Sequence, residues 1–420
     1  MKVAIIGSGI SGLTCASILS EKHKITLFEK NNYFGGHSNT IDINSKKLGN
    51  FSVDTGFIVF NKTNYPNFIK LLSYLNIKSA KSNMSFSVSV NNGALEYSGS
   101  LIGLIANYKN FLNTDYFLIL RDIFRFFNFG LSYRKLGPNK ETLKSYLERC
   151  NFSKAFRDFH LIPMASSIWS TNENDILNFP INSMLDFYNN HQLLNFFKRP
   201  EWLTIQGGSK NYVSKILSIL KRKDNHLFLN TKITTLKKNK NNKLILIEEN
   251  GNEHVFDYVV FANHTDEASH ILKTFQKEYY LTLKKFRFQN NITYLHTDRQ
   301  LMPKNTLTWS SWNYLSKSHN RKASVTYWMN KLQNLNLDKD IFVTLNPIKI
   351  PRPENILKVI DYSHPIFDSK SMEAQKEIKK IQGQNNIYFT GAWNGYGFHE
   401  DGVKSAIDVC KLLEIEPCWI

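Results

Sequence analysis

Residues 1–36 decide the fold, and they read MKVAIIGSGISGLTCASILSEKHKITLFEKNNYFGG. An apolar run at residues 2–6 has strand character and breaks into Gly7-Ser8-Gly9-Ile10-Ser11-Gly12. A helix-like segment follows, and a second predicted strand, residues 25–28, ends on Glu29. This order of strand, glycine loop, helix and strand is the context that a dinucleotide-binding unit requires.

Each glycine of the loop has its own expected role. Gly7 permits a tight turn, Gly9 lets the backbone approach a pyrophosphate, and Gly12 allows the helix to pack closely on the strand. Free N–H groups at the helix start would face the phosphates. Glu29, 17 residues past Gly12, can accept hydrogen bonds from the ribose hydroxyls, which argues against a 2′-phosphate there. The neighbouring Lys30 is included in the predicted site.

The glycine pair Gly35-Gly36 allows a second close backbone approach to the pyrophosphate. Domains that bind only NAD do not require this second approach, so we predict FAD as the cofactor. His37 and the short segment Asp54-Thr55-Gly56-Phe57 are the next predicted contacts, because the segment ends in a turn where the backbone can pass the flavin ring. An ordinary hairpin end is the alternative interpretation of this turn.

Composition limits the class of protein. A chain of 420 residues can form two domains with substantial cores. Because the first predicted strand begins at residue 2, we expect no signal peptide or transit segment. The four cysteines show no CxxC spacing, so we expect a reducing cytoplasm and no structural metal site.

The net charge of +18 has two interpretations. The excess is mostly lysine, and asparagine and isoleucine are also abundant, as AT-rich coding would produce. Alternatively, the charge attracts an anionic surface, such as the inner face of a membrane, to which the protein would bind peripherally. Nothing resembles a recognition helix or an RNA-binding motif, so we expect no nucleic acid partner.

The middle of the chain changes character at about residues 101–206. Leucine, isoleucine and aromatic residues recur there at helical spacing, but charged residues interrupt every window long enough to cross a bilayer. We predict a helical, aromatic-rich insert, which is either a buried core or the wall of an apolar tunnel or membrane-facing surface. Strands at about residues 286–345, including 291–295 and 307–312, alternate as in an antiparallel sheet, with a flat apolar wall of Trp309, Trp312, Tyr327 and Trp328.

Two further segments return the chain to the nucleotide-binding unit. After Gln206-Gly207-Gly208 we predict a helix and then strands, among them one that starts at Ile233 and one at residues 254–260. The continuous apolar run at residues 257–262 is typical of a buried parallel strand.

The last motif starts at residues 387–392, which read as a strand entering a turn, and leads into a helix at about residues 402–413. Its glycines indicate that the backbone passes something closely. If that is the isoalloxazine ring, the helix N-terminus points at N1 and the C2 carbonyl, where negative charge accumulates on reduction. The predicted contacts are Gly391, Ala392, Phe398, Asp401, which can also cap the helix, Gly402 and Val403.

Together these motifs resemble the flavin-containing amine oxidase superfamily along essentially the whole chain. The resemblance implies an α/β (α+β two-domain) fold: a discontinuous Rossmann-like FAD-binding domain of the amine oxidase/glutathione-reductase type, and a substrate domain with an antiparallel sheet and a helical insert. The implied division gives residues 1–84, 205–268 and 381–420 to the FAD domain, and residues 85–204 and 269–380 to the substrate domain.

A closer resemblance is to bacterial predicted NAD/FAD-binding proteins associated with cyclopropane-fatty-acid synthase-like methyltransferases. It is carried by residues 294–298, 309–314, 327–330 and 395–402, and it implies a methyltransferase of that type as a partner. Two departures from amine oxidases stand out. His37 occupies the position of their arginine after the glycine pair, and Thr390-Gly391-Ala392 lacks their acid at the end of the last strand.

The resemblance implies an oxidoreductase in which FAD takes a hydride from a C–H bond of an apolar substrate. We expect an unsaturated or methyl-branched fatty acyl chain, which would be desaturated or otherwise oxidised, as part of lipid metabolism. The candidate catalytic residues are Tyr396, His399 and Glu400. His399 could carry a proton, although a histidine hydrogen-bonded in a turn is an equal alternative. An amine oxidase, a flavin-dependent isomerase and a non-enzymatic flavin-binding partner of a methyltransferase remain open.

Overall fold

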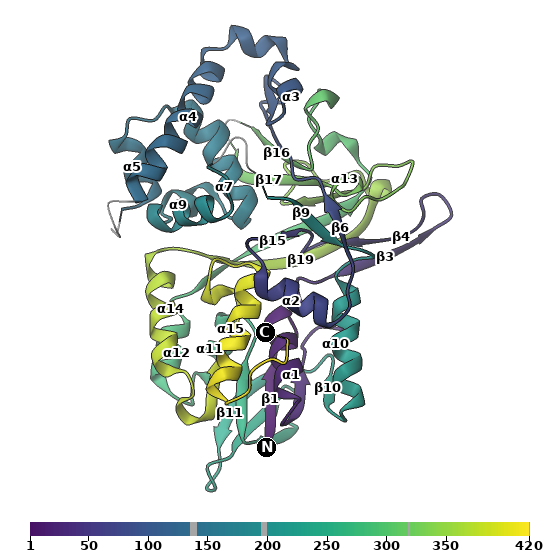
Figure 1. Ribbon diagram of the computed structural model, residues 1–420, viewed down its shortest axis with the longest axis vertical. Coiled ribbons are helices and arrows are strands. Elements are labelled where there is room, and N and C mark those ends of the chain that lie inside the picture. Colours follow the sequence, from purple (N-terminus) through teal and green to yellow (C-terminus); the bar gives the residue numbers. More distant parts are fainter. Residues whose placement is uncertain (135–140, 195–199, 318–319, 420) are drawn as a thin grey trace.

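The computed structural model describes residues 1–134, 141–194, 200–317 and 320–419. Within these ranges the first strand is the centre of a parallel sheet of five strands in the order β10-β2-β1-β14-β20. Strands from the start, the middle and the end of the chain meet in this sheet (Figure 1). Their bounds are β1 Lys2–Ile6, β2 Lys24–Phe28, β10 His226–Phe228, β14 Tyr258–Phe261 and β20 Ile387–Phe389.

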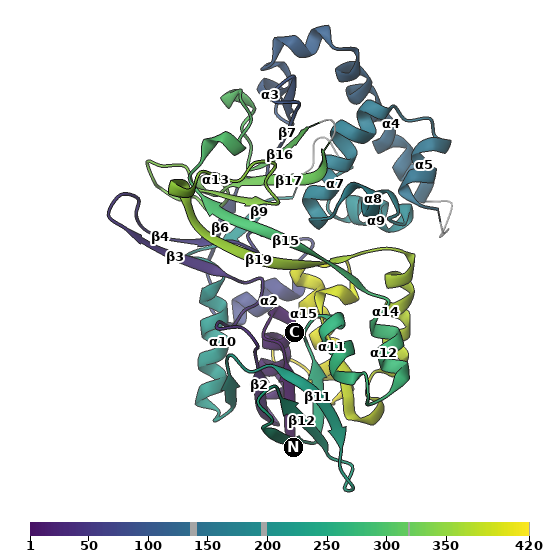
Figure 2. The same cartoon turned by 180° about the vertical axis from the view of Figure 1, so that it is seen from behind.

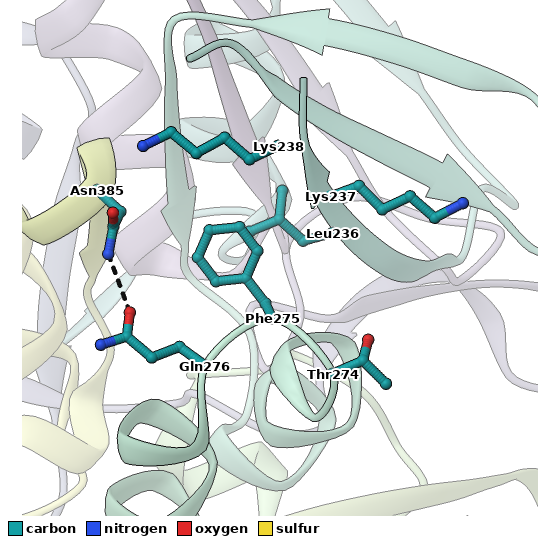
Figure 3. Close-up of a pocket in the computed structure, with 7 residues that line it drawn as sticks. All are labelled: Leu236, Lys237, Lys238, Thr274, Phe275, Gln276 and Asn385. Carbon is teal, nitrogen blue, oxygen red and sulfur yellow. Dashed lines mark hydrogen bonds between the residues drawn. The ribbon is translucent and has the colours of Figure 1, made fainter. Parts of the chain in front are cut away.

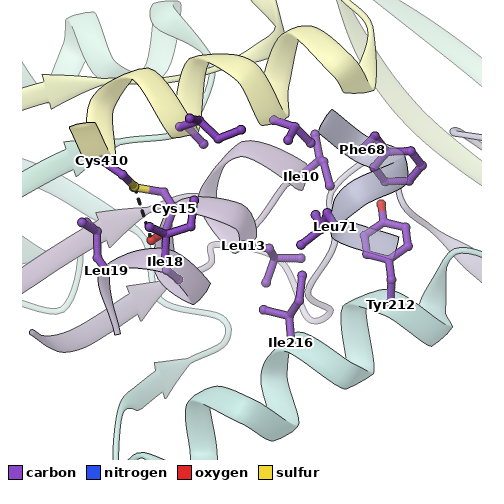
Figure 4. Packing of buried hydrophobic residues seen from close by; sticks show 14 of the residues in the cluster. Ile10, Leu13, Cys15, Ile18, Leu19, Phe68, Leu71, Tyr212, Ile216 and Cys410 are labelled. Atoms are coloured by element: carbon purple, nitrogen blue, oxygen red, sulfur yellow. Dashed lines mark hydrogen bonds between the residues drawn. The ribbon is translucent and has the colours of Figure 1, made fainter. Parts of the chain in front are cut away.

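Both faces of this sheet are covered, which explains why its strands are apolar runs. In β1, Val3 and Ile5 lie in one hydrophobic core, and Ala4 and Ile6 lie in the other. Helices around α1 close the first core, and Figure 4 shows their side chains packed together. The first core uses α1 Ile10–Leu19, α2 Pro66–Tyr74, α10 Lys210–Arg222 and α15 His399–Leu412; the second uses α11 Thr265–Leu272, α12 Lys277–Leu283, α14 Ser369–Ile381, β11 Ile233–Lys238, β12 Leu244–Glu248 and β13 Glu253–Phe256.

Helices α1 and α15 pack directly on each other although 379 residues separate the end of the first from the start of the second. The sulfur atoms of Cys15 and Cys410 are 3.7 Å apart in this contact, and both thiols are free (Figure 4). Burial, together with the neighbouring Cys15, raises the pKa of the Cys410 thiol. The contact is therefore an apolar, reduced one.

A second layer of structure lies beyond one end of the parallel sheet (Figures 1 and 2). In the described chain it contains a seven-stranded sheet in the order β19-β15-β18-β17-β16-β7-β8, antiparallel except between β16 and β7. The strands are β7 Phe86–Val90, β8 Leu95–Ser98, β15 Arg287–His296, β16 Trp312–Lys317, β17 Asn320–Trp328, β18 Phe342–Leu345 and β19 Ile356–Ile366; smaller sheets join β3 Thr40–Ser45 to β4 Gly49–Asp54, and β5 Phe60–Asn61 and β6 Ser79–Ser82 to β9 Trp202–Ile205.

The insert predicted at residues 101–206 is helical over most of its described length and has a buried aromatic core. No helix in the described ranges has both the length and the apolar character that a bilayer crossing needs. The insert consists of α3 Leu101–Ile105, η1 Tyr108–Leu112, α4 Thr114–Arg134, α5 Leu143–Arg149, α6 Lys154–Phe156, η2 Arg157–Leu161, α7 Ile162–Trp169, α8 Glu173–Leu177 and α9 Ile181–Asn190; short elements elsewhere are η3 Arg299–Leu301, η4 Thr306–Thr308, α13 Met329–Leu332, η5 Pro353–Asn355, η6 Gln384–Asn386 and η7 Ala392–Asn394.

Two strand predictions need correction, and one strand was not predicted. The predicted strand 254–260 is two strands, because Asp257 accepts a hydrogen bond from the Lys2 amide at 2.7 Å and the chain changes sheets there. The predicted strand 307–312 is mostly a 3₁₀ turn and loop, since the side chain of Asn305 accepts from the Leu307 amide. Strand β19 was not predicted, although it carries residues of the candidate site.

The predicted apolar wall is not flat. Trp309 meets Trp328 edge to face, with ring centroids 5.4 Å apart, and Trp312 meets Tyr327 in the same way at 5.0 Å. These four rings therefore form two perpendicular pairs.

The packing also bears on the predicted division into domains. Helices α12 and α14, which that division assigns to the substrate domain, pack into the second core of the parallel sheet. The division itself remains a prediction.

Candidate cofactor and active site

The glycine loop between β1 and α1 leaves one position open. Gly7 has a φ of +101°, and a side chain there would meet the Ala262 carbonyl at 2.9 Å. A Cβ on Gly12 would lie 1.9 Å from the Gly7 oxygen, whereas a Cβ on Gly9 would meet nothing within 4 Å. Two glycines are thus required by the protein's own backbone, and the third faces free space.

The N-terminus of α1 has properties of an anion site. Gly9 is its N-cap and supplies no side-chain hydrogen bond, and the first turn contains no acidic residue. The first N–H groups of a helix have no partner within the helix, and the helix dipole adds positive potential there. A diphosphate could accept hydrogen bonds from these groups.

The glycine pair lies against this helix start. Gly35 and Gly36 have φ values of +122° and +58°, and the Gly35 amide donates to the Ser8 carbonyl at 3.1 Å. A Cβ on Gly36 would lie 3.1 Å from the Gly9 Cα. The structure therefore brings the second predicted backbone approach beside the first.

Glu29 is held rigidly at the end of β2. One carboxylate oxygen accepts from the Ser8 amide at 3.0 Å and the Ser8 hydroxyl at 2.6 Å, and the other accepts from the Asn31 amide at 2.9 Å. Lys30 instead pairs with Glu267 of α11. The Thr231 amide donates to the Glu29 carbonyl at 2.8 Å, which places the start of β11, with the buried Ile233, beside this strand end.

The C-terminal motif reaches the same place. A Cβ on Gly402 would lie 2.8 Å from both the Ile10 side chain and the Ser11 hydroxyl, so α15 begins directly against the start of α1. Gly391 and Ala392 lie on the loop that enters α15, and Val403 is fully buried in the first core.

Asp401 holds the loop before α15 through hydrogen bonds to the loop backbone. Its carboxylate accepts from the backbone amides of Tyr396 at 3.0 Å and Phe398 at 2.9 Å. The predicted helix start at Gly402 is three residues too late, because α15 begins at His399. Phe398 is the N-cap of this helix, and Asp401 stabilises the helix start from within the first turn. Burial raises the pKa of Asp401 to about 6 although both hydrogen bonds oppose the shift. Ser405, which the sequence did not single out, donates to the Gly391 carbonyl at 3.2 Å and accepts from the Gly391 amide at 3.0 Å.

Asp54, the first residue of segment 54–57, is hydrogen-bonded to other parts of the protein. Asp54 is buried and accepts hydrogen bonds from Thr40, from the amide and hydroxyl of Ser209, and from Gln333. Burial raises the pKa of this carboxyl to about 6, against those hydrogen bonds. Its partners are therefore all within the protein.

The rest of this segment lies beside the glycine pair. A Cβ on Gly56 would lie 2.3 Å from the His37 carbonyl oxygen. The hydroxyl of Thr55 is 2.7 Å from that of Tyr362. Phe57 stacks on His399, with ring centroids 3.5 Å apart.

A group of histidines that the sequence did not predict surrounds His37. Its ring stacks on Tyr362 at 4.8 Å and lies 4.9 Å from His364 and 6.3 Å from His264. The Nδ1 atom of His364 accepts from Asn291 at 2.7 Å, but Nε2 of His37 has no hydrogen-bond partner. No three His, Cys, Asp or Glu side chains in the described ranges are placed to hold a metal ion.

These histidines are neutral in the folded protein at pH 7. Burial, and then the neighbouring His264, lowers the pKa of His364 to about 4. Burial and the other histidines hold the pKa of His37 well below its usual value. All three rings retain some accessible surface, although protein surrounds them. The group lies next to the glycine loop in the chain, because His37 directly follows Gly36, which packs against Gly9.

The three predicted catalytic residues differ in their surroundings. His399 Nε2 lies 3.1 Å from both the Ser38 and the Tyr212 hydroxyl, and burial lowers its pKa to about 3. Tyr396 is half-buried beside α9, and burial raises its pKa.

Glu400 is engaged at the start of another helix. Its carboxylate accepts from the Asn67 amide at 3.1 Å, from the Asn67 side chain at 2.6 Å and from the Phe68 amide at 3.0 Å, and thus caps α2. A catalytic role for any of the three candidates stays a prediction.

A separate surface pocket of about 520 Å³ lies between β11 and α11–α12 (Figure 3). Its lining is mostly polar, and Asn385 donates to Gln276 across it at 2.9 Å. None of its lining residues belongs to the glycine motifs, so it is not the cofactor site.

FAD fits the residues that meet at the carboxyl ends of β1, β14 and β20. The uncapped start of α1, the open position at Gly9 and the unpartnered Nε2 of His37 lie together there. This is the edge at which parallel sheets bind nucleotides. The individual contacts of the predicted residues with FAD remain predictions.

Comparisons with known proteins agree with this geometry. A family model described as flavin-containing amine oxidoreductase matches residues 10–331. A 4,4′-diapophytoene desaturase (4,4′-diaponeurosporene-forming) of Staphylococcus aureus is 47% identical over 57 residues, which are 13% of this chain and only 10% of the desaturase.

Solved structures share the fold over nearly the whole chain. Cyclohexylamine oxidase from Brevibacterium oxydans IH-35A superposes with a TM-score of 0.68 at 14% identity, covering 98% of this chain and 99% of the oxidase. A CLA-producing fatty acid isomerase from P. acnes superposes with a TM-score of 0.66 at 12% identity over 98% of both chains. The chain therefore belongs to the flavin-containing amine oxidoreductase family and is a flavin-dependent oxidoreductase with FAD as its cofactor.

Proposed function

We propose that this oxidoreductase removes a hydride from a C–H bond of an apolar substrate, an unsaturated or methyl-branched fatty acyl chain, in a desaturation or related oxidation. One observation carries the proposal: the aromatic core of the helical insert extends to the loop that precedes α15. FAD, when bound, would accept the hydride, as flavins do in C–H oxidation.

The wall next to this loop is mainly aromatic, and Asp186 of α9 is a charged neighbour of Tyr396. Phe187 of α9 stacks on Phe398 at 4.9 Å and lies 6.2 Å from Tyr396. His191 stacks on Phe187 at 3.9 Å, and burial lowers the pKa of His191 to about 4, so its ring is neutral at pH 7. An acyl chain could bind these rings by burying apolar surface.

The protein's own residues would position the reacting groups. The N-terminus of α15 would support negative charge on a cofactor bound beside it, as helix N-termini do. Neutral His399, packed on Phe57, keeps that end of the site rigid and free of positive charge. The desaturase match supports C–H chemistry, and the fatty acid isomerase shows only that the fold occurs in a protein with that substrate.

Anaerobic bleaching of the flavin absorbance tests the proposal. We expect bleaching with phospholipids that carry unsaturated or methyl-branched chains, and none with a panel of amines. Peroxide release with amines in air would instead assign amine oxidation. Conversion of double-bond geometry without net bleaching or oxygen uptake would assign isomerisation. Either result would overturn the proposed reaction but not the family.

The methyltransferase partner belongs to the same proposal, because a cyclopropane-synthase-like enzyme would modify the same acyl chains. Co-purification of this protein with such an enzyme from cells that express both would support the pairing. Independent elution of the two proteins would remove it and leave the oxidation proposal in place.

A further inference from the structure

The start of the helical insert and the neighbouring η4 expose large apolar side chains at one end of the molecule. Six of them are between 62% and 86% exposed, and they come from α3, η1 and η4. We call this set the apolar cap; its members are Leu101, Ile102, Ile105, Tyr108, Leu112 and Leu307.

The apolar cap is one surface although its residues are far apart in sequence. Elements α3 and η4 are in contact, and the Asn305 side chain donates to the Ala106 carbonyl at 2.9 Å. The Tyr116 hydroxyl of α4 donates to the Leu104 carbonyl at 2.8 Å. These bonds fix the segments relative to the sheet and the long helix.

In the segments that carry the apolar cap, polar side chains face the protein interior and large apolar side chains face the solvent. Asn110 is buried and donates to the Glu96 carbonyl at 2.7 Å, while Glu96 itself is buried and accepts from the amides of Lys304 and Asn305. A Cβ on Gly103 would lie 1.7 Å from the Ser98 hydroxyl, so small and polar groups face inward. The apolar side chains are therefore not needed to close the local core, and their exposure indicates a non-aqueous partner.

Charge distinguishes among partners. Between Ser100 and Asn113 the only charged residue is Lys109, which is exposed, and Lys304 is exposed close to Leu307. The nearest acidic residues in the sequence are Asp115, in the first turn of α4, and the buried Glu96. The whole chain carries +18. A second copy would bring the same positive charge to the contact, whereas an anionic bilayer offers both apolar depth and phosphate charge.

We propose that the apolar cap docks the protein on the surface of an anionic phospholipid bilayer, with its apolar side chains in the interface and Lys109 and Lys304 among the headgroups. Figures 1 and 2 place α3 at the end of the molecule remote from the N-terminus of β1. Docking there leaves the parallel sheet in water and brings the helical insert to the membrane. This inference does not depend on the proposed reaction.

Vesicle flotation of the FAD-loaded full chain tests the docking. We expect flotation with vesicles of phosphatidylcholine and phosphatidylglycerol in equal parts, and weaker flotation with phosphatidylcholine alone. The triple variant Ile102→Ser, Ile105→Ser and Leu112→Ser should bind at least about tenfold more weakly, since it removes apolar surface from the interface. Lys109→Gln with Lys304→Gln should remove the preference for anionic vesicles.

The matched control is a triple variant at exposed apolar residues elsewhere: Ile350→Ser, Val359→Ser and Leu412→Ser. It should float like the wild type, and all variants should keep the flavin absorbance spectrum. Equal flotation of the two triple variants, or no flotation of the wild type, would overturn the proposal. If the wild type does not bind vesicles but forms a dimer in size-exclusion chromatography, and only the triple variant at Ile102, Ile105 and Leu112 is a monomer, the proposal would be overturned in favour of self-association.

Discussion

Gly9 and Gly12 belong to the same glycine motif, but their surroundings differ. A Cβ at Gly9 meets nothing within 4 Å, and its φ of −64° is open to other residues, whereas Gly12 faces the Gly7 oxygen at 1.9 Å. We expect Gly9→Val to change the free energy of unfolding of the apoprotein by about 1 kcal/mol or less. The same variant should weaken FAD binding at least about tenfold, because the side chain would occupy the diphosphate position.

Gly12→Val is the contrasting variant. It should destabilise the apoprotein by about 3 kcal/mol or more, because the backbone of the loop must move. Thermal unfolding followed by circular dichroism, and FAD titration followed by flavin fluorescence, separate the two effects. Wild-type FAD affinity in Gly9→Val would contradict the assignment of the open position.

The histidines predict a dependence of stability on pH. The pKa of His364 is about 4 in the folded protein and about 6.5 in an unfolded chain. Between these values the unfolded state binds more protons, so this group makes the free energy of unfolding fall as the pH decreases from about 6.5 to about 4, by at most about 1.4 kcal/mol per pH unit. Asp54 and Asp401, with pKa values raised to about 6, act in the opposite direction.

Comparing His364→Gln with the wild type measures how much His364 contributes to the pH dependence of the free energy of unfolding. We expect His364→Gln to show a shallower loss of stability between pH 7 and pH 5 than the wild type, in chemical denaturation at each pH. The carboxyl groups are common to both proteins and cancel in the difference. His226→Gln, at an exposed position, serves as the control and should keep the wild-type slope. Parallel slopes for His364→Gln and the wild type would contradict the assignment.

At the scale of elements, Glu400 separates a structural role from a catalytic one. Its carboxylate caps α2 through the Asn67 and Phe68 amides. We expect Glu400→Gln to lower the free energy of unfolding by about 1 kcal/mol and to leave kcat nearly unchanged. A fall in kcat of about 100-fold or more with unchanged stability would instead identify Glu400 as an acid–base group. Asn67→Ala, which removes one donor but keeps the backbone amides, is the control.

Sequence patterns predicted those elements whose conformation in the fold is specified by the residues of the element itself. The first strand, the glycine loop and α15 belong to this class, because glycine, apolar runs and a capping carboxylate act over a few residues. Strand β19 was missed, since it alternates polar residues and contains His364-Pro365, and only its neighbour β15 defines its pairing. Tyr362, His364 and His264 were also missed, because two segments distant in sequence, β19 and the residue before α11, bring them to His37.

The chain could not reveal which polar groups are already satisfied. Asp54 was predicted as a cofactor contact from its place at a turn, yet its four hydrogen bonds come from residues about 14, 155 and 279 positions away. Such partners have no signature at the turn itself. The open position at Gly9 was predictable, because a helix start after a glycine loop has few other functions.

At the scale of the molecule, Asp54 joins parts that are distant in sequence. It links β4 to Ser209, at the start of α10, and to Gln333, after α13. Asparagine would lose acceptor capacity and leave a buried donor unpaired, so we expect Asp54→Asn to destabilise the protein by about 2–4 kcal/mol. Differential scanning calorimetry at pH 7 measures this loss.

Asp42→Asn is the matched control for that measurement. Asp42 pairs with Lys210 at the protein surface, where an ion pair contributes little. A similar loss in both variants would show that Asp54 does not hold the parts together.

The contact between α1 and α15 has a consequence for biosynthesis. During translation the first of these helices leaves the ribosome 380 residues before its companion, and at about 5–20 residues per second this interval lasts roughly 20–80 s. During this interval the apolar side chains of α1 that α15 covers in the folded protein lack this partner. Because the loop before α15 belongs to the predicted FAD site, we expect the cofactor to bind only after most of the chain has been synthesised.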